Sequence, residues 1–121
     1  MARTAFSVVT PKGPHAAVSA GQLDFLFAAA DPANGNSFPC TGRELVLVHN
    51  DHATDPATVI ITSASDPYGR TKDIATYSLA AGDYAAFWIG STIGWKQSDG
   101  KAYLDVAGTG TIKFTVLRIP D

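Results

Sequence analysis

The sequence predicts an all-β fold: a single-domain antiparallel β-sandwich of jelly-roll-like form, or a small barrel, of about eight strands. Short segments in which apolar and polar residues alternate recur along the chain. Turn-forming Gly, Pro, Asn and Asp residues separate these segments, and no segment clearly shows the periodicity of an amphipathic helix. The 121 residues are enough for one domain with a buried core.

The N-terminal part carries the weaker strand signals. Thr4–Val9 alternates and is expected to form a first strand, which Pro11–Pro14 ends because proline cannot donate to a β-ladder. His15–Ala20 consists of small residues and suits a short edge strand. In Leu23–Ala28, phenylalanines two residues apart favour a strand, although the following alanines leave a short helix open. Asp31–Asn36 is rich in turn-forming residues.

The central part contains clearer strand patterns. Phe38–Gly42 is irregular, and Arg43–Asn50 then includes four consecutive apolar residues. Such a run predicts a central strand that is covered on both faces. Further strands are expected at three apolar or alternating segments that polar loops separate: Thr58–Ser63, Ile74–Leu79 and Tyr84–Ile89.

The C-terminal part shows the clearest alternation. Ala102–Val106 and Thr111–Leu117 are joined by a glycine-rich connection whose length suits a hairpin loop. We therefore expect these two segments to form a half-buried β-hairpin. Its core side should be made by the apolar residues of one face: Leu104, Ile112, Phe114 and Val116.

The composition restricts the expected partners. Charged residues make up only 17% of the chain, so part of the surface is expected to rest on another molecule, unless this is simply a small Thr-, Ser- and Ala-rich domain. The net charge of -2 gives no basic field for nucleic acid. The single cysteine, Cys40, excludes an intramolecular disulfide. No run is apolar enough for a membrane span or a signal peptide, so we expect no membrane partner and synthesis in a cytoplasm.

Metal-competent side chains cluster at His49, Asp51, His52 and Asp55. Their spacing matches no recognised zinc set, so ordinary polar loop groups are the preferred interpretation. The loop Ser65–Asp73 contains carboxylates but lacks the pattern of a calcium loop. We expect neither a metal ion nor a cofactor.

Catalytic motifs are not evident either. Asp99 and Asp105 flank one expected strand, as the two carboxylates of a glycosidase would flank a bond, but alternation points Asp105 to solvent beside Tyr103. The sequence has no nucleophile elbow, P-loop or dinucleotide-binding glycine motif. We expect no catalytic residue and a protein that is not an enzyme, with a hydrolase as a minor alternative.

Aromatic residues offer a possible contact surface for a sugar or a protein, although most aromatic side chains of a small β-domain lie in the core. Trp95 is the residue of most interest. It lies between Gly94 and Lys96 in an expected loop, where an exposed tryptophan would indicate a partner. The other candidates are Tyr77, Tyr84, Phe87 and Trp88.

An ordered series of strand and turn motifs begins at Gly42 and continues to Ile119. It consists of Gly-Arg-x-x-Leu-x-Val-x-Asn at Gly42–Asn50, the strand Thr58–Thr62, Ala81–Asp83, Gln97–Gly100 followed by Ala102–Val106, and Leu117–Ile119. In this order the chain resembles the small structural proteins of tailed bacteriophages that accompany the major capsid protein, including head decoration (cement) proteins. It departs from them at Tyr84–Ile89, where an aromatic run replaces a glycine- and proline-rich texture.

The resemblance implies a capsid decoration protein, which binds the outer surface of the major capsid shell and stabilises it against internal pressure. It implies the major capsid protein as partner, a homo-oligomer on the capsid, and a place on the virion after synthesis in the bacterial host cytoplasm. Residues 1–14 are expected to be a flexible or partner-contacting segment, with Phe6 and Trp95 as contact residues. The alternatives are another virion component (neck, tail or head fibre) and a carbohydrate-binding β-sandwich module.

Overall fold

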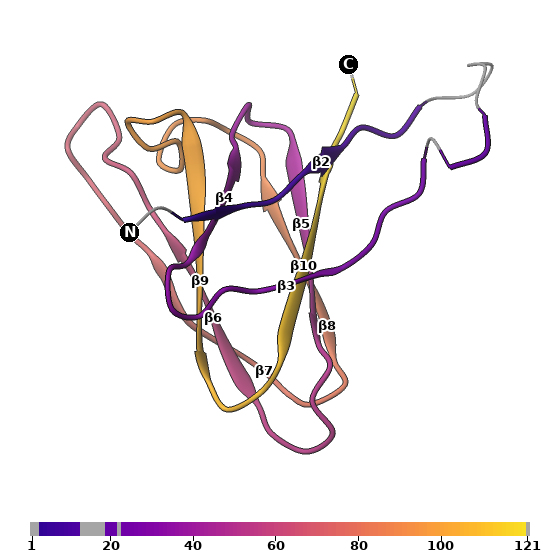
Figure 1. Ribbon diagram of the computed structural model, residues 1–121. Coiled ribbons are helices and arrows are strands. Elements are labelled where there is room, and N and C mark those ends of the chain that lie inside the picture. The colour runs from indigo at the N-terminus through magenta and orange to yellow at the C-terminus, as the bar shows by residue number, and fades with distance from the viewer. Residues whose placement is uncertain (1–2, 13–18, 22, 121) are drawn as a thin grey trace.

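The computed structural model describes residues 3–12, 19–21 and 23–120, with Thr76 described by its backbone alone. In these residues ten strands form two mixed sheets, and no helix occurs (Figure 1). The strands are β1 Thr4–Ala5, β2 Val8–Val9, β3 Ala28–Ala29, β4 Asn36–Pro39, β5 Glu44–Asn50, β6 Ala57–Thr62, β7 Ile74–Leu79, β8 Tyr84–Ile89, β9 Lys101–Gly108 and β10 Ile112–Arg118. The predicted all-β sandwich is confirmed.

The two sheets each contain five strands. Sheet A has the order β1-β4-β9-β6-β7. In sheet B, β10 has β2 and β3 on one side and β5 on the other, and β8 follows β5. The pairs β1–β4 and β2–β10 are parallel, whereas the remaining pairs are antiparallel. Neither sheet closes into a barrel, so each keeps edge strands.

The core lies between the sheets, where alternate residues of each strand meet. The four residues expected on the core side of the C-terminal segments are all buried, with Leu104, Phe114 and Val116 fully enclosed. Burial of each such side chain contributes about 1.5–3 kcal/mol. The inner faces also contribute Phe38, Val46, Val48, Val59, Ile61 and Ile89.

The predicted hairpin at the C-terminus is wrong. β9 pairs with β4 and β6 in sheet A, whereas β10 pairs with β2, β3 and β5 in sheet B. The connection therefore passes from one sheet to the other at an end of the sandwich instead of turning back within one sheet (Figure 1). A Cβ atom at Gly110 would lie 2.9 Å from the Ala57 Cβ, so close packing requires this glycine. Alternation identified the buried faces correctly, but it carries no information on the partner strand.

The N-terminal segment also differs from the prediction. Thr4–Val9 is not one strand: β1 joins sheet A and β2 joins sheet B. Phe6 bridges the two sheets, with its ring centroid 5.5 Å from that of Phe114. The described part of the expected contacting segment, residues 3–12, is thus built into the sandwich, and residues 1–2 and 13–14 lie outside the described residues.

Three other segments correct the strand assignments. β4 occupies residues expected to be turn or irregular, whereas only Ala28 of the expected strand Leu23–Ala28 is in a strand, β3. The expected edge strand His15–Ala20 falls mostly outside the described residues. β5 is central as predicted, but its outer residues Leu45, Leu47 and His49 are only half-buried, so one face alone is fully covered.

Among the described residues, no helix is long and apolar enough to cross a membrane.

Candidate functional site

The outer face of sheet B carries side chains that are mostly apolar. We call this surface the apolar face and define it by outward residues of β2, β5, β8 and β10 together with two phenylalanines that precede β3. The strand register sets its rows, because opposite residues of neighbouring strands point to the same side of a sheet. Its members are Val9, Phe25, Phe27, Leu45, Leu47, His49, Tyr84, Ala86, Trp88 and Leu117.

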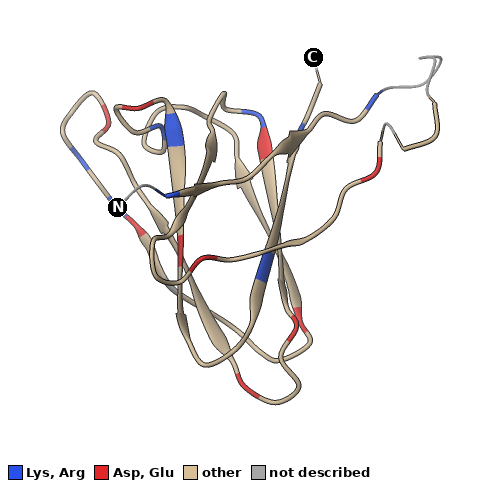
Figure 2. Cartoon of the chain, viewed as in Figure 1, with Lys and Arg blue, Asp and Glu red and all other residues tan. Residues whose placement is uncertain are grey.

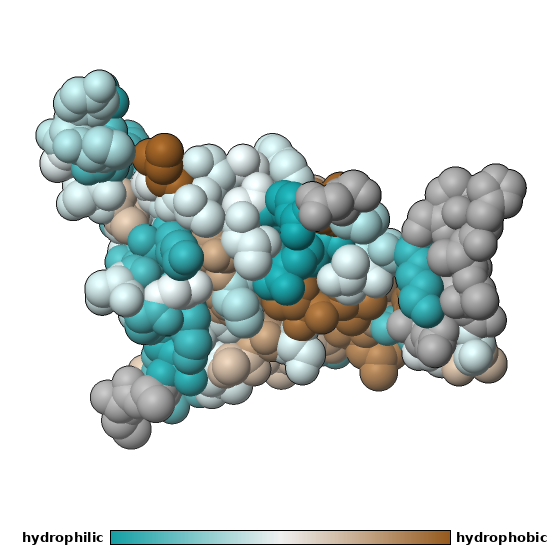
Figure 3. All heavy atoms as spheres, turned by 90° about the horizontal axis from the view of Figure 1, so that it is seen from above, coloured by the Kyte–Doolittle hydropathy of each residue, from teal (hydrophilic) through white to brown (hydrophobic). Residues whose placement is uncertain are grey.

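One row of the apolar face crosses the whole sheet. Val9 lies opposite Leu117, Leu117 opposite Leu45, and Leu45 opposite Trp88. Seen from above, hydrophobic atoms gather around β2 and the C-terminal end of β10 (Figure 3). At the far end of this row, Trp88 is 56% exposed on the edge strand. The row is therefore an apolar band that ends in an exposed tryptophan.

A second row ends in a cluster of rings. The imidazole of His49 stacks on the ring of Tyr84, with centroids 4.0 Å apart and an interplanar angle of 15°. Phe27 meets both rings edge-on, at 6.2 Å from His49 and 6.0 Å from Tyr84. Phe25 in turn lies 6.4 Å from Phe27. Such stacked and edge-on geometries are favourable, so they hold the outer side of Tyr84, itself 67% exposed, in a defined position.

Charge is sparse on the apolar face, and the charge of Lys113 is paired with a carboxylate. β8 has no charged residue and is tan along its whole length in Figure 2. Lys113, opposite His49, places its Nζ 2.9 Å from Asp51 Oδ2. This hydrogen bond, with the positive charge of Lys113, lowers the pKa of the Asp51 carboxyl. A partner that covers this face would therefore have little charge to desolvate.

The two residues expected to contact a partner lie elsewhere. Phe6 is only 8% exposed and packs in the core. Trp95 is half-buried and packs against the core from the loop that follows β8. Trp88 is the exposed tryptophan. The period-two pattern of Tyr84–Ile89 contained this information, because a core position for Ile89 forces Trp88 to the opposite face.

The candidate metal ligands do not converge. The Nδ1 atom of His52 accepts backbone N–H groups from Thr54 and Asp55, and His49 stacks on Tyr84. In the loop Ser65–Asp73, the Asp66 carboxylate accepts both the backbone N–H and the Nε–H of Arg70. The backbone hydrogen bond is the main cause of the lowered Asp66 pKa. No cluster of three metal-competent His, Cys, Asp or Glu side chains occurs within the described ranges.

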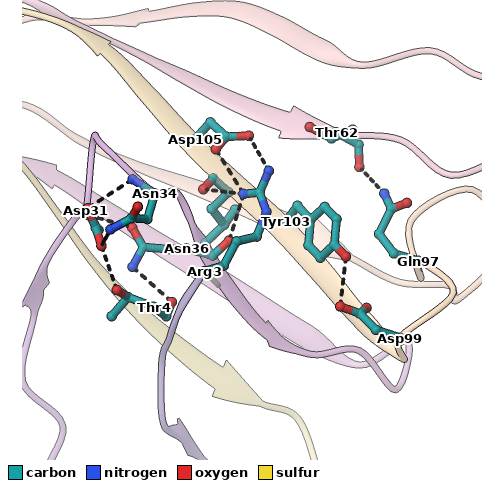
Figure 4. Close-up of polar contacts among 11 residues, drawn as sticks. Arg3, Thr4, Asp31, Asn34, Asn36, Thr62, Gln97, Asp99, Tyr103 and Asp105 are labelled. Atoms are coloured by element: carbon teal, nitrogen blue, oxygen red, sulfur yellow. Dashed lines mark hydrogen bonds and ion pairs between the residues drawn. The ribbon is translucent and has the colours of Figure 1, made fainter. Parts of the chain in front are cut away.

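The carboxylates Asp99 and Asp105 each have a separate partner on the outer face of sheet A (Figure 4). Arg3 holds Asp105 with two hydrogen bonds, of 2.9 and 3.2 Å. The same guanidinium lies 4.1 Å from the ring centroid of Tyr103, whose hydroxyl donates a 2.7 Å hydrogen bond to Asp99. That bond lowers the pKa of Asp99 and raises the pKa of Tyr103. These contacts attach the N-terminal residues to β9, which is a structural role.

A pocket of about 200 Å³ lies between β3, the end of β9 and the start of β10. Its lining consists of small or apolar side chains, including Ala29, Pro32, Val106 and Ile112, and contains no titratable group. A general acid or base would need such a group within hydrogen-bond distance of a substrate. The apolar face is therefore the stronger candidate for function.

The motif residues of the resemblance have structural roles in this fold. The buried Glu44 carboxylate accepts a 2.7 Å hydrogen bond from Arg118 Nε, which joins the first and last motifs. The Asn50 amide donates to Leu79 O and accepts from the Thr111 N–H. Gln97 donates to the carbonyl oxygens of Thr62 and Ser63. The polar residues of these motifs thus hold the sandwich together, whereas Leu45 and Leu117 of the same motifs lie on the apolar face.

No protein-family model, no curated protein and no solved structure matches the chain.

Proposed function

We propose that this protein is a bacteriophage capsid decoration (cement) protein, which is not an enzyme and which binds the outer surface of the major capsid shell. The observation that carries the proposal is the apolar face of sheet B. Tyr84, Trp88 and Phe25 are 67%, 56% and 43% exposed there, and the charge of the nearby Lys113 is paired with Asp51. Protein interfaces are enriched in Tyr, Trp and Phe and depleted in charge at their centres. The resemblance supplies the identity of the partner.

The proposed mechanism is mechanical. Strands β5 and β8 pair along six consecutive residues, so the apolar face is pre-organised and loses little entropy when it docks. A domain that bridges subunits of the assembled shell binds the assembled state alone. By mass action, such a ligand stabilises that state by about 2.7 kcal/mol per site at a hundredfold excess over its dissociation constant. Many copies on the virion surface would together oppose the pressure of packaged DNA.

The direct test uses mature shells isolated from a phage that lacks this protein. Addition of the purified protein should give saturable binding and a higher disruption temperature. Trp88→Ala should weaken binding about tenfold or more, as expected for a large exposed tryptophan that an interface buries. Tyr68→Ala is the matched control, because Tyr68 is 82% exposed but lies in the loop Ser65–Asp73, outside the apolar face. Failure of the wild-type protein to bind such shells refutes the proposal.

The alternatives give different results. A neck, tail or head-fibre component would label one vertex or the tail instead of the whole shell. A carbohydrate-binding module would use Tyr84 and Trp88 as stacking platforms, because Trp95 packs against the core. Glycan-array binding that disappears in Trp88→Ala, without affinity for shells, would favour this second candidate.

A further inference from the structure

Strand β8 is an edge strand without the usual protection. Proteins generally shorten their edge strands, bulge them or place charges on them, because an exposed edge pairs readily with another chain. β1, β2 and β3 contain two residues each. β7 contributes an extra residue opposite Ile60, which makes a bulge in its pairing with β6. In the described residues β8 pairs with β5 alone, in a regular six-residue ladder, and is uncharged.

The outward backbone groups of β8 can be assigned from the ladder. Asn50 donates its N–H to the Asp83 carbonyl, which makes the neighbouring pair His49–Tyr84 a non-hydrogen-bonded pair. Bonded and non-bonded pairs alternate in an antiparallel ladder, so residues 85, 87 and 89 bond to β5. The N–H and C=O groups of Tyr84, Ala86 and Trp88 therefore point away from β5, toward the open edge.

The β8 sequence is self-complementary about Ala86. In an antiparallel pairing centred on Ala86, Tyr84 of one chain lies opposite Trp88 of the other. These are the residues whose backbone groups point outward, and each such pair exchanges two N–H···O bonds. On the inner face, the small Ala85 lies opposite the large Phe87, and both are half-buried. Aromatic pairs and large–small pairs both pack well across strands.

We infer that two copies of this chain associate through β8, antiparallel about a two-fold axis at Ala86, and join their B sheets into one continuous sheet. A closed two-fold pairing consumes the open edge of both copies, which explains why β8 carries no protective charge. On the inner face, the contact between the two copies also includes Tyr77, which is 45% exposed. The ring of Tyr77 meets the ring of Phe87 edge-on, with centroids 5.2 Å apart. This inference is independent of the proposed function, since it concerns the purified chain alone.

Cysteine cross-linking tests the register. Residues of a hydrogen-bonded antiparallel pair have Cα atoms about 5.5 Å apart, within the range of a disulfide. Ala86→Cys should therefore form a disulfide-linked dimer of twice 12.7 kDa under mild oxidation. Tyr84→Cys should not, because the two copies of residue 84 would lie about 14 Å apart along the strands. The native Cys40 is 3% exposed and does not compete.

Sedimentation tests the association itself. The wild-type chain should sediment as a dimer at micromolar concentration, and Ala86→Pro should raise the dimer dissociation constant at least tenfold. Proline removes the outward N–H alone, so the urea unfolding midpoint of the monomer should change little. Ala86→Lys, which places like charges at the two-fold axis, provides a second variant, and Ala53→Lys in an exposed loop is its control. A monomeric wild type, or equal cross-linking of Ala86→Cys and Tyr84→Cys, would overturn the inference. An oligomer that both Ala86 variants leave intact would overturn it as well.

Discussion

Asn50 offers the sharpest test of how this sandwich is held together. Its side chain is fully buried and makes four hydrogen bonds. The amide nitrogen donates to the carbonyl oxygens of Asp55 and Leu79, each at 2.9 Å. The amide oxygen accepts the N–H groups of His52 at 3.1 Å and Thr111 at 3.2 Å. Asn50 thereby connects the end of β5 to three other parts of the chain.

Asn50→Leu keeps the approximate volume and removes all four bonds. A buried polar group that loses its partner costs about 1–3 kcal/mol. The Leu79 carbonyl is in a buried bond, whereas the other three groups are in part-buried bonds that water can partly replace. We therefore expect a loss of about 2–4 kcal/mol in the free energy of unfolding.

Urea denaturation followed by tryptophan fluorescence measures this loss. The midpoint should fall while the slope with denaturant stays constant, as for a change in stability alone. Asn34→Leu is the control, since Asn34 is only half-buried and its side chain donates to Asp31 within one turn, and it should cost less than about 1 kcal/mol. A loss below about 0.5 kcal/mol for Asn50→Leu would refute the role given to this residue.

Three further predictions concern the core, the buried carboxylate and the crossing connection. Phe114→Ala should lower the free energy of unfolding by about 3–5 kcal/mol, because the ring is fully buried, whereas Phe25→Ala, at 43% exposure, should change it by less than about 1 kcal/mol in the same urea assay. Burial alone would raise the pKa of Glu44, but hydrogen bonds from Thr41 and Arg118 outweigh it and the folded-state pKa lies below 4.5. The stabilising contribution of the ionised Glu44 is therefore complete above pH 4.5 and is lost as the pH falls through the folded-state pKa. Glu44→Gln should make the unfolding midpoint less sensitive to pH in this acidic range. An unchanged pH profile would contradict this. Gly110→Ala should destabilise the fold by about 1–3 kcal/mol, because its Cβ would lie 2.9 Å from Asn50 Nδ2 and from Ala57 Cβ, and a thermal midpoint equal to that of wild type would show that the connection can shift.

Much of the fold followed from alternation, for a simple physical reason. A strand with one buried face favours apolar residues at every second position, and β6, β8, β9 and β10 show this pattern in sequence. β5 is instead evident from its run of four consecutive apolar residues. Alternation does not identify the neighbouring strand, however. β9 and β10 are adjacent in sequence and have the faces expected of a hairpin, yet they lie in opposite sheets.

The missed strand β4 has a different cause. Its residues Asn36 and Ser37 are polar and follow a turn, so the pattern resembles a loop. Both are nevertheless buried, and the Asn36 amide donates to Thr4 O and accepts the Asp31 N–H. Hydrogen bonds of this kind make a polar strand possible, but the bond to Thr4 is a long-range contact with β1 that the sequence pattern does not contain.

The candidate surface was only partly predictable. The sequence shows the aromatic run Tyr84–Ile89, but the flanking Gly94 and Lys96 favour Trp95 as the exposed tryptophan. The exposed tryptophan is Trp88, because it alternates with the buried Ile89 and therefore lies on the outer face of sheet B. The ring cluster of Phe27, His49 and Tyr84 joins three segments and depends in the same way on how the chain is folded.

A map of the phage particle by electron cryo-microscopy tests the proposed function most directly. Particles assembled with and without this protein should differ by density repeated over the whole outer surface of the shell, with the apolar face of sheet B against the major capsid protein. Density confined to one vertex or to the tail, or no difference between the two particles, would contradict the proposal.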